Sequence, residues 1–470
     1  MKQELLHLSA VELARRIRER EISVTEVVEA HIQRTKQVNP HINAVIIPMY
    51  EQALEAARTA DAQIAASGTD NLPPLFGVPI TMKDCWPVEG VRFVGGSWYL
   101  RDNVADHDAP AVKLLRDAGA IIIGKTNLPD GCWLAESTNP VFGQTNNPHN
   151  VSHSAGGSSG GEGAIIAAGG SPLGLGSDIA GSVRIPAAFN GCVSLKPSAG
   201  RVPSEEHMPL PPEEIFSWNT AGPMARRVED LALALQILSR TPVQDYRDIS
   251  LEGRPLSALT PDAIFPLHRE VAETVMMAAG ALRSAGMVNT TRNDFPLQEV
   301  GYTYAGIFRK YGSPAFRKFL GGGKVYNTWE ELQAHWRGQG RITRRVLFFT
   351  AFMDVVGWVA SLRGLDNFRK LEDFKARILA SMKPGGVLVL PLHPLPVPRH
   401  NWSYFTLRQV PYAFMFNALG MPAAVVPIRY GRKNLPYVVQ VVGHPGEDEV
   451  VLAVAAELER VFGGWQMAAL

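Results

Sequence analysis

Apolar residues recur at helical spacing in several stretches of the chain. Residues 8–38 hold two such stretches, and each begins with a serine placed three residues before a glutamate, Ser9 before Glu12 and Ser23 before Glu26. This is the pattern of a helix N-terminal capping box. The same spacing predicts further helices at residues 51–66, 160–170, 226–240 and 448–462.

Short apolar runs alternate with these helices. One run ends at Lys83, and others are expected as strands at residues 120–123, 171–178, 385–391, 423–428 and 436–443. Helices that alternate with such strands indicate an α/β fold in which helices cover a sheet. We expect one domain over residues 1–470, with a variable insertion at about 260–380 that could cover a cleft.

The most apolar stretch is VLFFTAFMDVVGWVASL, residues 346–362. It is shorter than about 20 residues and contains Asp354, so we do not expect it to span a membrane. A helix that is buried or lines a pocket is expected here, whereas a dimer contact or a membrane-surface contact stays open. The aromatic residues that would wall an apolar cleft are Phe348, Phe349, Phe352 and Trp358.

Composition changes this picture little. The chain has 470 residues, 46% hydrophobic and 19% charged, and a formal net charge of +1, which argues against nucleic acid as the main partner. The first residues lack the apolar core of a secretory signal, and Cys85, Cys132 and Cys192 are spaced as neither a disulfide framework nor a zinc motif. His149 and His153 lie in a loop-like stretch. We therefore expect a cytoplasmic protein without metal or cofactor.

The stretch from Gly156 to Gly181 is dense in glycine but is threaded with isoleucine and leucine, so a buried loop system is favoured over a linker. It supplies three candidate nucleophiles, Ser158, Ser159 and Ser182. A serine needs a base and an oxyanion hole before it reacts. Lys83 ends an apolar strand, and burial favours the neutral amine, which is a base. Taken alone, a lysine that pairs with Asp84 or extends its amine to solvent is the simpler interpretation.

Together these segments resemble the amidase signature family. The stretches GGSSGGEGA and GSDIAGSVRIPAAFNGCVSLKPS are close to its signature, and GVPITMKD, AGAIIIGKTNLPD, AGPMAR, NALGMPAAVVP and VVQVVG occur in the family's order. The resemblance covers almost the whole chain and is weak only across about 240–390. The detail GGSPLGLGSDI is similar to the fatty acid amide hydrolase branch and to bacterial amidases near it.

The resemblance implies a single α/β/α domain around a large, mixed, twisted sheet. It also implies that Ser182 is the nucleophile, that Ser158 follows a cis peptide bond and bridges Ser182 to Lys83, and that Lys83 is the base. The implied oxyanion-hole donors are the backbone N–H groups of Ile179, Ala180, Gly181 and Ser182. The implied supporting residues are Ser159, Asp178 and Arg184.

This chain departs from the family in one place, because Ala180 stands where a glycine is usual. Alanine keeps the N–H donor but disfavours positive φ, so the oxyanion geometry requires a negative φ at this position. Arg201 follows the signature and is expected either to contact a substrate carbonyl or to pack at its loop.

The expected function is that of a stand-alone serine hydrolase for hydrophobic acyl or aryl amides, with carbamates (urethanes) and esters as further candidates. Its partner would be a small hydrophobic substrate, and a homodimer is a candidate assembly. One alternative is a glutaminase subunit of an amidotransferase complex. Another is a non-catalytic binding protein, against which the joint presence of Lys83, Ser158 and Ser182 argues.

Overall fold

The strands of the computed structural model build one large sheet and one small hairpin. The structure describes residues 2–259, 267–290, 297–402 and 410–470. The strands are β1 (Val45–Pro48), β2 (Pro79–Lys83), β3 (Ile121–Thr126), β4 (Thr138–Asn139), β5 (Gly143–Gln144), β6 (Leu173–Asp178), β7 (Val193–Lys196), β8 (Thr220–Ala225), β9 (Pro255–Ala258), β10 (Val288–Asn289), β11 (Val387–Leu390), β12 (Ala423–Tyr430) and β13 (Pro436–Val442).

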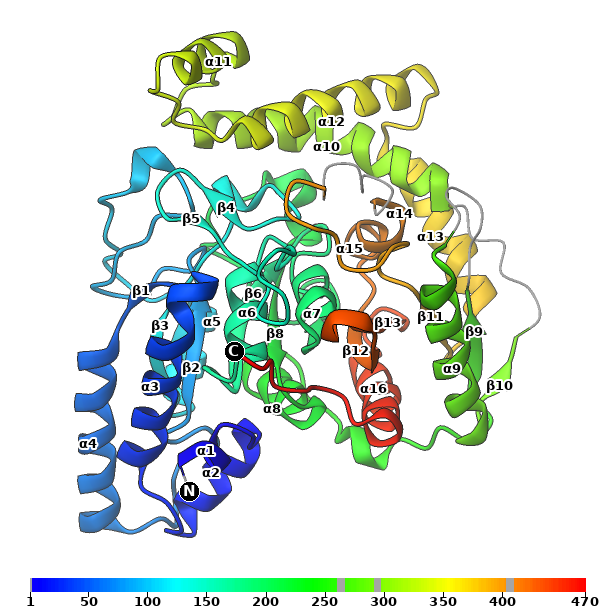
Figure 1. Cartoon of the computed structure of the whole chain (residues 1–470). Helices are drawn as coiled ribbons and strands as arrows, with labels where there is room; N and C mark the ends of the chain where they lie inside the picture. The colour runs from blue at the N-terminus through cyan, green and yellow to red at the C-terminus, as the bar shows by residue number, and fades with distance from the viewer. Residues whose placement is uncertain (1, 260–266, 291–296, 403–409) are drawn as a thin grey trace.

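The large sheet has 11 strands in the order β1-β3-β2-β6-β8-β7-β12-β13-β11-β9-β10 (Figure 1). Strand β2 runs parallel to β3 and β6, whereas β6 runs antiparallel to β8, and β12 to β13. The sheet is therefore mixed, and the prediction of an α/β fold around a large mixed sheet is confirmed.

Helices pack on both faces of this sheet, and further helices lie outside these layers. They are α1 (Lys2–Leu5), α2 (Ala10–Arg18), α3 (Val24–Ile42), α4 (Tyr50–Ser67), α5 (Pro110–Asp117), α6 (Gly160–Ala167), α7 (Arg184–Asn190), α8 (Val228–Leu238), α9 (Arg269–Ser284), α10 (Leu297–Leu320), α11 (Thr328–Trp336), α12 (Arg344–Leu362), α13 (Phe368–Met382), α14 (Val410–Ala413), α15 (Met415–Ala418) and α16 (Asp448–Phe462).

The alternation of side chains along β2 shows how the two faces differ. Ile80 and Met82 enter the main apolar core, which also takes residues from α5, α8, α9 and α16. Thr81 points the other way, where its hydroxyl donates to the Glu162 carboxylate of α6 at 2.6 Å. Helices α6 and α7 contribute a second apolar core. The central strands are thus buried on both faces.

The glycines of β6 are explained by close packing against α6. A Cβ atom on Gly176 would lie 2.7 Å from the Ser159 hydroxyl oxygen, and one on Gly174 would overlap the Glu162 carboxylate. Larger residues at these two positions would push α6 away from the sheet. The glycine-rich stretch is therefore a packed part of the core, as its apolar content predicts.

One of the two predicted capping boxes is complete. At Ser23, the hydroxyl accepts from the Glu26 N–H, and the Glu26 carboxylate accepts from the Ser23 N–H. The Ser9 hydroxyl accepts from the Glu12 N–H, but the Glu12 carboxylate accepts from Arg15 and Arg16 instead of reaching back. The motif at Ser9 is therefore a single N-cap, because two arginines compete for its glutamate.

Helices α10, α11 and α12 form an outer layer, seen at the top of Figure 1, within the predicted insertion, and α13 lies below them at the right. Residues 260–266 and 291–296 of that insertion lie outside the described residues. Helix α12 packs on α10, yet Phe348, Phe352 and Trp358 are 65%, 41% and 53% exposed. The expectation of a buried helix is wrong for these three residues, because they share the face turned away from α10.

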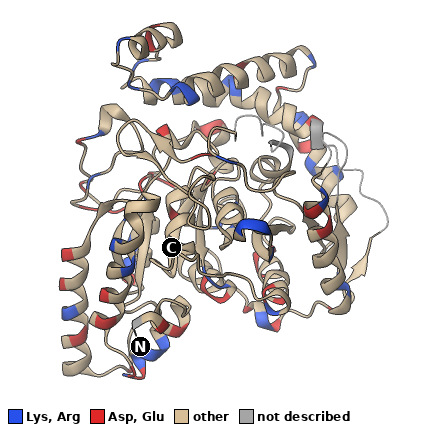
Figure 2. Cartoon of the chain, in the orientation of Figure 1, with Lys and Arg blue, Asp and Glu red and all other residues tan. Residues whose placement is uncertain are grey.

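Helix α12 also has a length and composition compatible with a membrane span, although core helices can share both features. It is the one such helix among the described residues, and 33% of its apolar window is buried inside the protein. Figure 2 shows charged residues interspersed over the outer helices. In α12 they are Arg344 and Arg345 at its start and Asp354 in its middle, which pairs with Arg317 of α10.

Candidate active site

The predicted catalytic residues come from three segments that meet near the carboxyl ends of two central strands. Lys83 ends β2, Ser158 precedes α6, and Ser182 lies between β6 and α7. Strands β2 and β6 are parallel neighbours, so their carboxyl ends lie side by side. Functional groups in α/β sheets commonly gather at such carboxyl ends.

Lys83 is fully buried and donates to two hydroxyl groups. Its Nζ atom lies 2.7 Å from Ser158 Oγ and 2.9 Å from Ser177 Oγ. Asp84 instead pairs with the buried Lys125, at 2.7 Å. The simpler interpretation of Lys83, an ion pair with Asp84 or an amine that extends to solvent, is therefore wrong on both counts, and the amine faces two hydroxyl groups.

The segments that carry Ser158 and Ser182 lie side by side and are joined by a backbone hydrogen bond. The peptide bond between Gly157 and Ser158 is cis, as the resemblance implies. The Ser159 N–H donates to the Ser182 carbonyl oxygen at 3.1 Å, which ties the two segments together. Ser182 is 7% exposed, whereas Ser158 is 1% exposed. Of the two serines, Ser182 is therefore the more accessible to a substrate.

The loop before Ser182 presents free backbone donors. The Gly181 N–H donates to the Asp178 carboxylate at 2.6 Å, so the four expected oxyanion donors are reduced to three. The N–H groups of Ile179, Ala180 and Ser182 make no hydrogen bond to any residue that the structure describes. Ala180 is not among the described non-glycine residues with positive φ, whereas Gly181 has φ +99. Ala180 therefore has the negative φ that the oxyanion geometry requires at this position.

A buried polar network holds this loop. Arg184 pairs with Asp178 at 3.0 Å, and it also donates to the side-chain oxygens of Asn417 and Gln440. Asn417 returns a hydrogen bond to the Asp178 backbone oxygen at 2.8 Å. Burial alone would raise the pKa of Asp178, but Arg184 and the loop N–H groups hold that pKa well below its usual range. Asp178 is thus an anion around which the loop is built.

Ser159 supports the other side of the site. Its hydroxyl lies 3.4 Å from both the backbone nitrogen and the carbonyl oxygen of Ser177. Nearby, the Glu162 carboxylate accepts from the Thr81 and Thr126 hydroxyls, and burial raises the pKa of Glu162 to about 7. The segment before α6 is therefore anchored to β6 and to the sheet.

Two polar residues of the site were missed by sequence reasoning, Ser177 and His207. Ser177 connects Lys83 to His207, because its hydroxyl lies 2.9 Å from Lys83 Nζ and 2.8 Å from His207 Nε2. Ser177 directly precedes Asp178 in the stretch GSDIAGS, so the sequence could have identified it as a candidate site residue. His207 comes from an irregular, proline-rich stretch that carried no signal.

Arg201 lies apart from this group. Its guanidinium donates to Ser239, to the Gly446 carbonyl oxygen and to Glu449 at the start of α16. These contacts join the loop after β7 to α16 and to the end of α8. The packing role expected for Arg201 therefore describes its contacts, and the substrate role gains no support.

Comparison with known proteins gives consistent results. A sequence model of the family described as Amidase matches residues 26–452. Fatty-acid amide hydrolase 2-B of Danio rerio is 35% identical, over 98% of this chain and 90% of that protein. Indoleacetamide hydrolase of Bradyrhizobium diazoefficiens is 31% identical, over 97% and 86%. The structure of 6-aminohexanoate cyclic dimer hydrolase with its substrate superposes with a TM-score of 0.82, at 26% identity and 99% coverage of both chains.

Proposed function

The chain belongs to the amidase family, and from that premise we propose that it is a stand-alone serine hydrolase that cleaves hydrophobic acyl or aryl amides. The observation that carries this proposal is the contact of the fully buried Lys83 with Ser158, at 2.7 Å. A buried lysine amine whose hydrogen-bond partners, among the residues that the structure describes, are both hydroxyls is suited to act as a base for a serine nucleophile.

The proposed reaction uses these residues in sequence. Neutral Lys83 takes the proton of Ser158, which takes the proton of Ser182, and the Ser182 oxygen attacks the amide carbon. The negative charge on the tetrahedral intermediate is stabilised by the N–H groups of Ile179, Ala180 and Ser182. The proton returns by the same path to the leaving amine, and water then hydrolyses the acyl-enzyme.

The surroundings of the loop favour an apolar substrate. Ile179 and Ala180 are half-buried and belong to an aromatic cluster with Trp133, Tyr304 and Phe414. Trp133 stacks on Phe308 of α10 with ring centroids 4.5 Å apart, and the Tyr304 hydroxyl donates to the Ile179 carbonyl oxygen at 3.1 Å. A substrate carbonyl at the free N–H groups would therefore place its substituents beside aromatic side chains.

Carbamates and esters are included in the proposed substrate range. Attack on either produces a tetrahedral oxyanion like that of an amide, so the same three N–H donors serve. The leaving group of an ester needs less help from the proton path than an amine does. We therefore expect the amide reaction to depend most strongly on Lys83.

The test is hydrolysis of four substrates by the purified chain: an aryl anilide, an aryl carbamate, a fatty acyl amide and glutamine. Ser182→Ala and Lys83→Ala are each expected to lower kcat by about 10³-fold or more, because residues of a catalytic triad act as a unit. Ser152→Ala, which removes the hydroxyl of an exposed loop serine, is the matched control and keeps full activity.

The panel also separates the alternatives. Turnover of glutamine alone would favour the amidotransferase subunit. Activity that survives Ser182→Ala would contradict the mechanism, and an unreactive Ser182 toward a fluorophosphonate probe would favour a non-catalytic protein.

A further inference from the structure

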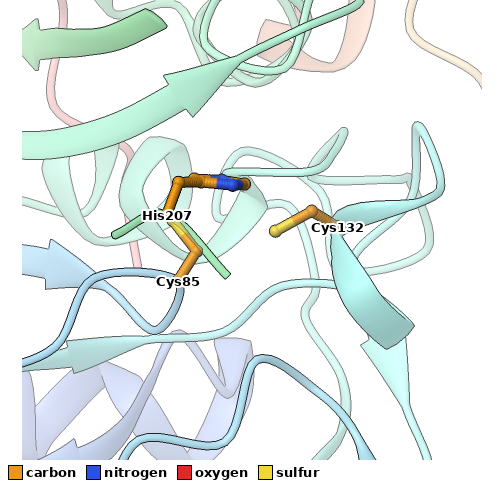
Figure 3. A group of neighbouring side chains, drawn as sticks. All are labelled: Cys85, Cys132 and His207. Atoms are coloured by element: carbon orange, nitrogen blue, oxygen red, sulfur yellow. The ribbon is translucent and has the colours of Figure 1, made fainter. Parts of the chain in front are cut away.

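Three potential metal ligands from distant parts of the sequence meet beside Lys83. Cys85 follows β2, Cys132 ends the short 3₁₀ helix η2 (Asp130–Cys132), and His207 lies in the loop between β7 and β8. Their ligand atoms all lie within 4.8 Å of one another (Figure 3). Cys85, Cys132 and His207 are far apart in the sequence, so their spacing does not reveal the cluster, which forms only in the folded chain.

The hydrogen bonds of His207 define which nitrogen can bind a metal ion. Its Nδ1 atom lies 2.9 Å from the Pro209 carbonyl oxygen. A carbonyl oxygen only accepts, so we assign the proton to Nδ1, which leaves the lone pair of the neutral ring on Nε2. A backbone carbonyl that holds the other ring N–H is the usual support of a metal-binding histidine. The Nε2 atom is the one that faces the cluster, 2.8 Å from Ser177 Oγ.

The two thiols differ in their setting. Cys85 is fully buried, and its Sγ atom lies 3.5 Å from Ser177 Oγ. Cys132 is half-buried and has φ 64, an unusual conformation for a residue with a side chain. Thiolate is the form of cysteine that binds metals, so a metal ion takes the place of the thiol proton.

We propose that Cys85, Cys132 and His207 form a binding site for a soft divalent cation of the Zn²⁺ class, with the fourth coordination position open. Two sulfur donors and one imidazole nitrogen suit zinc, whereas magnesium and calcium select oxygen donors. Each thiol still protonated releases its proton to solvent on binding, and no oxidation or reduction is involved.

Occupation of this site would inhibit hydrolysis. The Nε2 lone pair that now accepts from Ser177 would instead bind the metal, so the Ser177 hydroxyl would lose its acceptor. Ser177 is one of the two hydroxyl partners of Lys83, at 2.9 Å. The orientation of the lysine amine toward Ser158 would therefore be disturbed. This inhibitory part rests on the proposed function, whereas the binding part does not.

Co²⁺ titration of the full purified chain tests the binding part without a substrate. Thiolate ligands give bound Co²⁺ an intense charge-transfer absorption, which Zn²⁺ then abolishes by displacement. Cys132→Ser is expected to weaken binding by at least about tenfold, as does the loss of even a supporting group at a metal site. The matched control is Cys192→Ser, because Cys192 is buried against the Gly163 carbonyl oxygen and outside the cluster. No absorption in the wild type, or equal absorption in Cys132→Ser, would overturn the site.

Inhibition by Zn²⁺ tests the coupling to catalysis. Each variant is compared with its own metal-free rate, and the wild type and Cys192→Ser are expected to lose most of their activity and to recover it with EDTA. Cys132→Ser is expected to resist. Equal inhibition of Cys132→Ser would overturn the coupling. A clear Co²⁺ spectrum in a chain that hydrolyses none of the substrates would count against the proposed function and support the site.

Discussion

The loop before Ser182 and the outer face of α12 differ in which kind of side chain is buried: charged residues are buried in the loop, whereas aromatic residues are exposed on α12. In the loop, Asp178 and Arg184 are fully buried, and their polar atoms are bonded to each other, to Asn417 and to Gln440. On α12, Phe348 and Trp358 stay 65% and 53% exposed. Charged groups are therefore buried beside the candidate nucleophile, and apolar rings are exposed on the outer face of α12.

This contrast shows where the structure is most constrained. A buried charge is tolerated only when it is paired and hydrogen-bonded, so one change in the loop affects several partners at once. An exposed aromatic residue has few contacts to lose. We therefore expect substitutions in the loop to have the largest effects and substitutions on the outer face of α12 to have the smallest.

Asp178→Asn is expected to destabilise the protein most. It leaves the buried Arg184 guanidinium without its counter-ion, and breaking one side of a buried pair costs about 3–5 kcal/mol. Urea unfolding measures the loss. The control Asp245→Asn removes one side of the exposed pair with Arg247, and it should cost less than about 1 kcal/mol. Equal losses would show that burial does not distinguish the two pairs.

The same substitution predicts a pH dependence. Because the folded state holds the pKa of Asp178 below its usual range, the stabilisation is fully present above the ordinary carboxyl pKa, near 4. It is lost as the pH falls through the folded-state pKa. The difference in stability between the wild type and Asp178→Asn should therefore shrink in acid.

Glu162→Gln is expected to act in the opposite pH range. Burial raises the pKa of Glu162 to about 7, so its contribution is full below pH 4.5 and is lost as the pH rises through 7. The difference corresponds to about 3 kcal/mol. Unfolding free energies across this range should fall more steeply in the wild type than in the variant. Parallel curves would contradict the raised pKa.

The sequence predicted the loop better than it predicted α12. Glycine and small residues permit the positive φ and the close packing found in residues 155–181, and the motif order pointed to Lys83, Ser158, Ser182, Asp178 and Arg184. The spacing of Glu12 with Arg15 and Arg16 allows both helical ion pairs, but it does not decide whether Glu12 turns to them or back to the Ser9 N–H. His207 could not be predicted, because it reaches Ser177 from a distant segment only in the folded chain. The apolar content of α12 was visible, but its exposure depends on the neighbours that it packs against, chiefly α10 on one face.

His207→Ala tests a positioning residue inside the site, because His207 holds the Ser177 hydroxyl that Lys83 also contacts. Loss of one hydrogen-bond acceptor is expected to lower kcat for an anilide by about tenfold. The KM and the thermal unfolding midpoint should change little. His207→Gln keeps an acceptor oxygen and should recover part of the rate. A fall in stability that tracks the fall in kcat in both variants would instead indicate a structural role.

The smallest effect is expected on the outer face of α12. Phe348→Ser removes a ring that is 65% exposed, so the free energy of unfolding should change by no more than about 0.5 kcal/mol. The neighbouring Leu347 is 1% exposed, and Leu347→Ala should cost about 2–5 kcal/mol because it leaves a cavity against the outer layer. Urea unfolding of both variants at two protein concentrations makes the test. If Phe348→Ser costs as much as Leu347→Ala at the higher concentration only, the face is covered by a second copy of the chain in solution. If the two costs match at both concentrations, the exposed face of α12 is packed within the chain itself, and the contrast between the two regions fails.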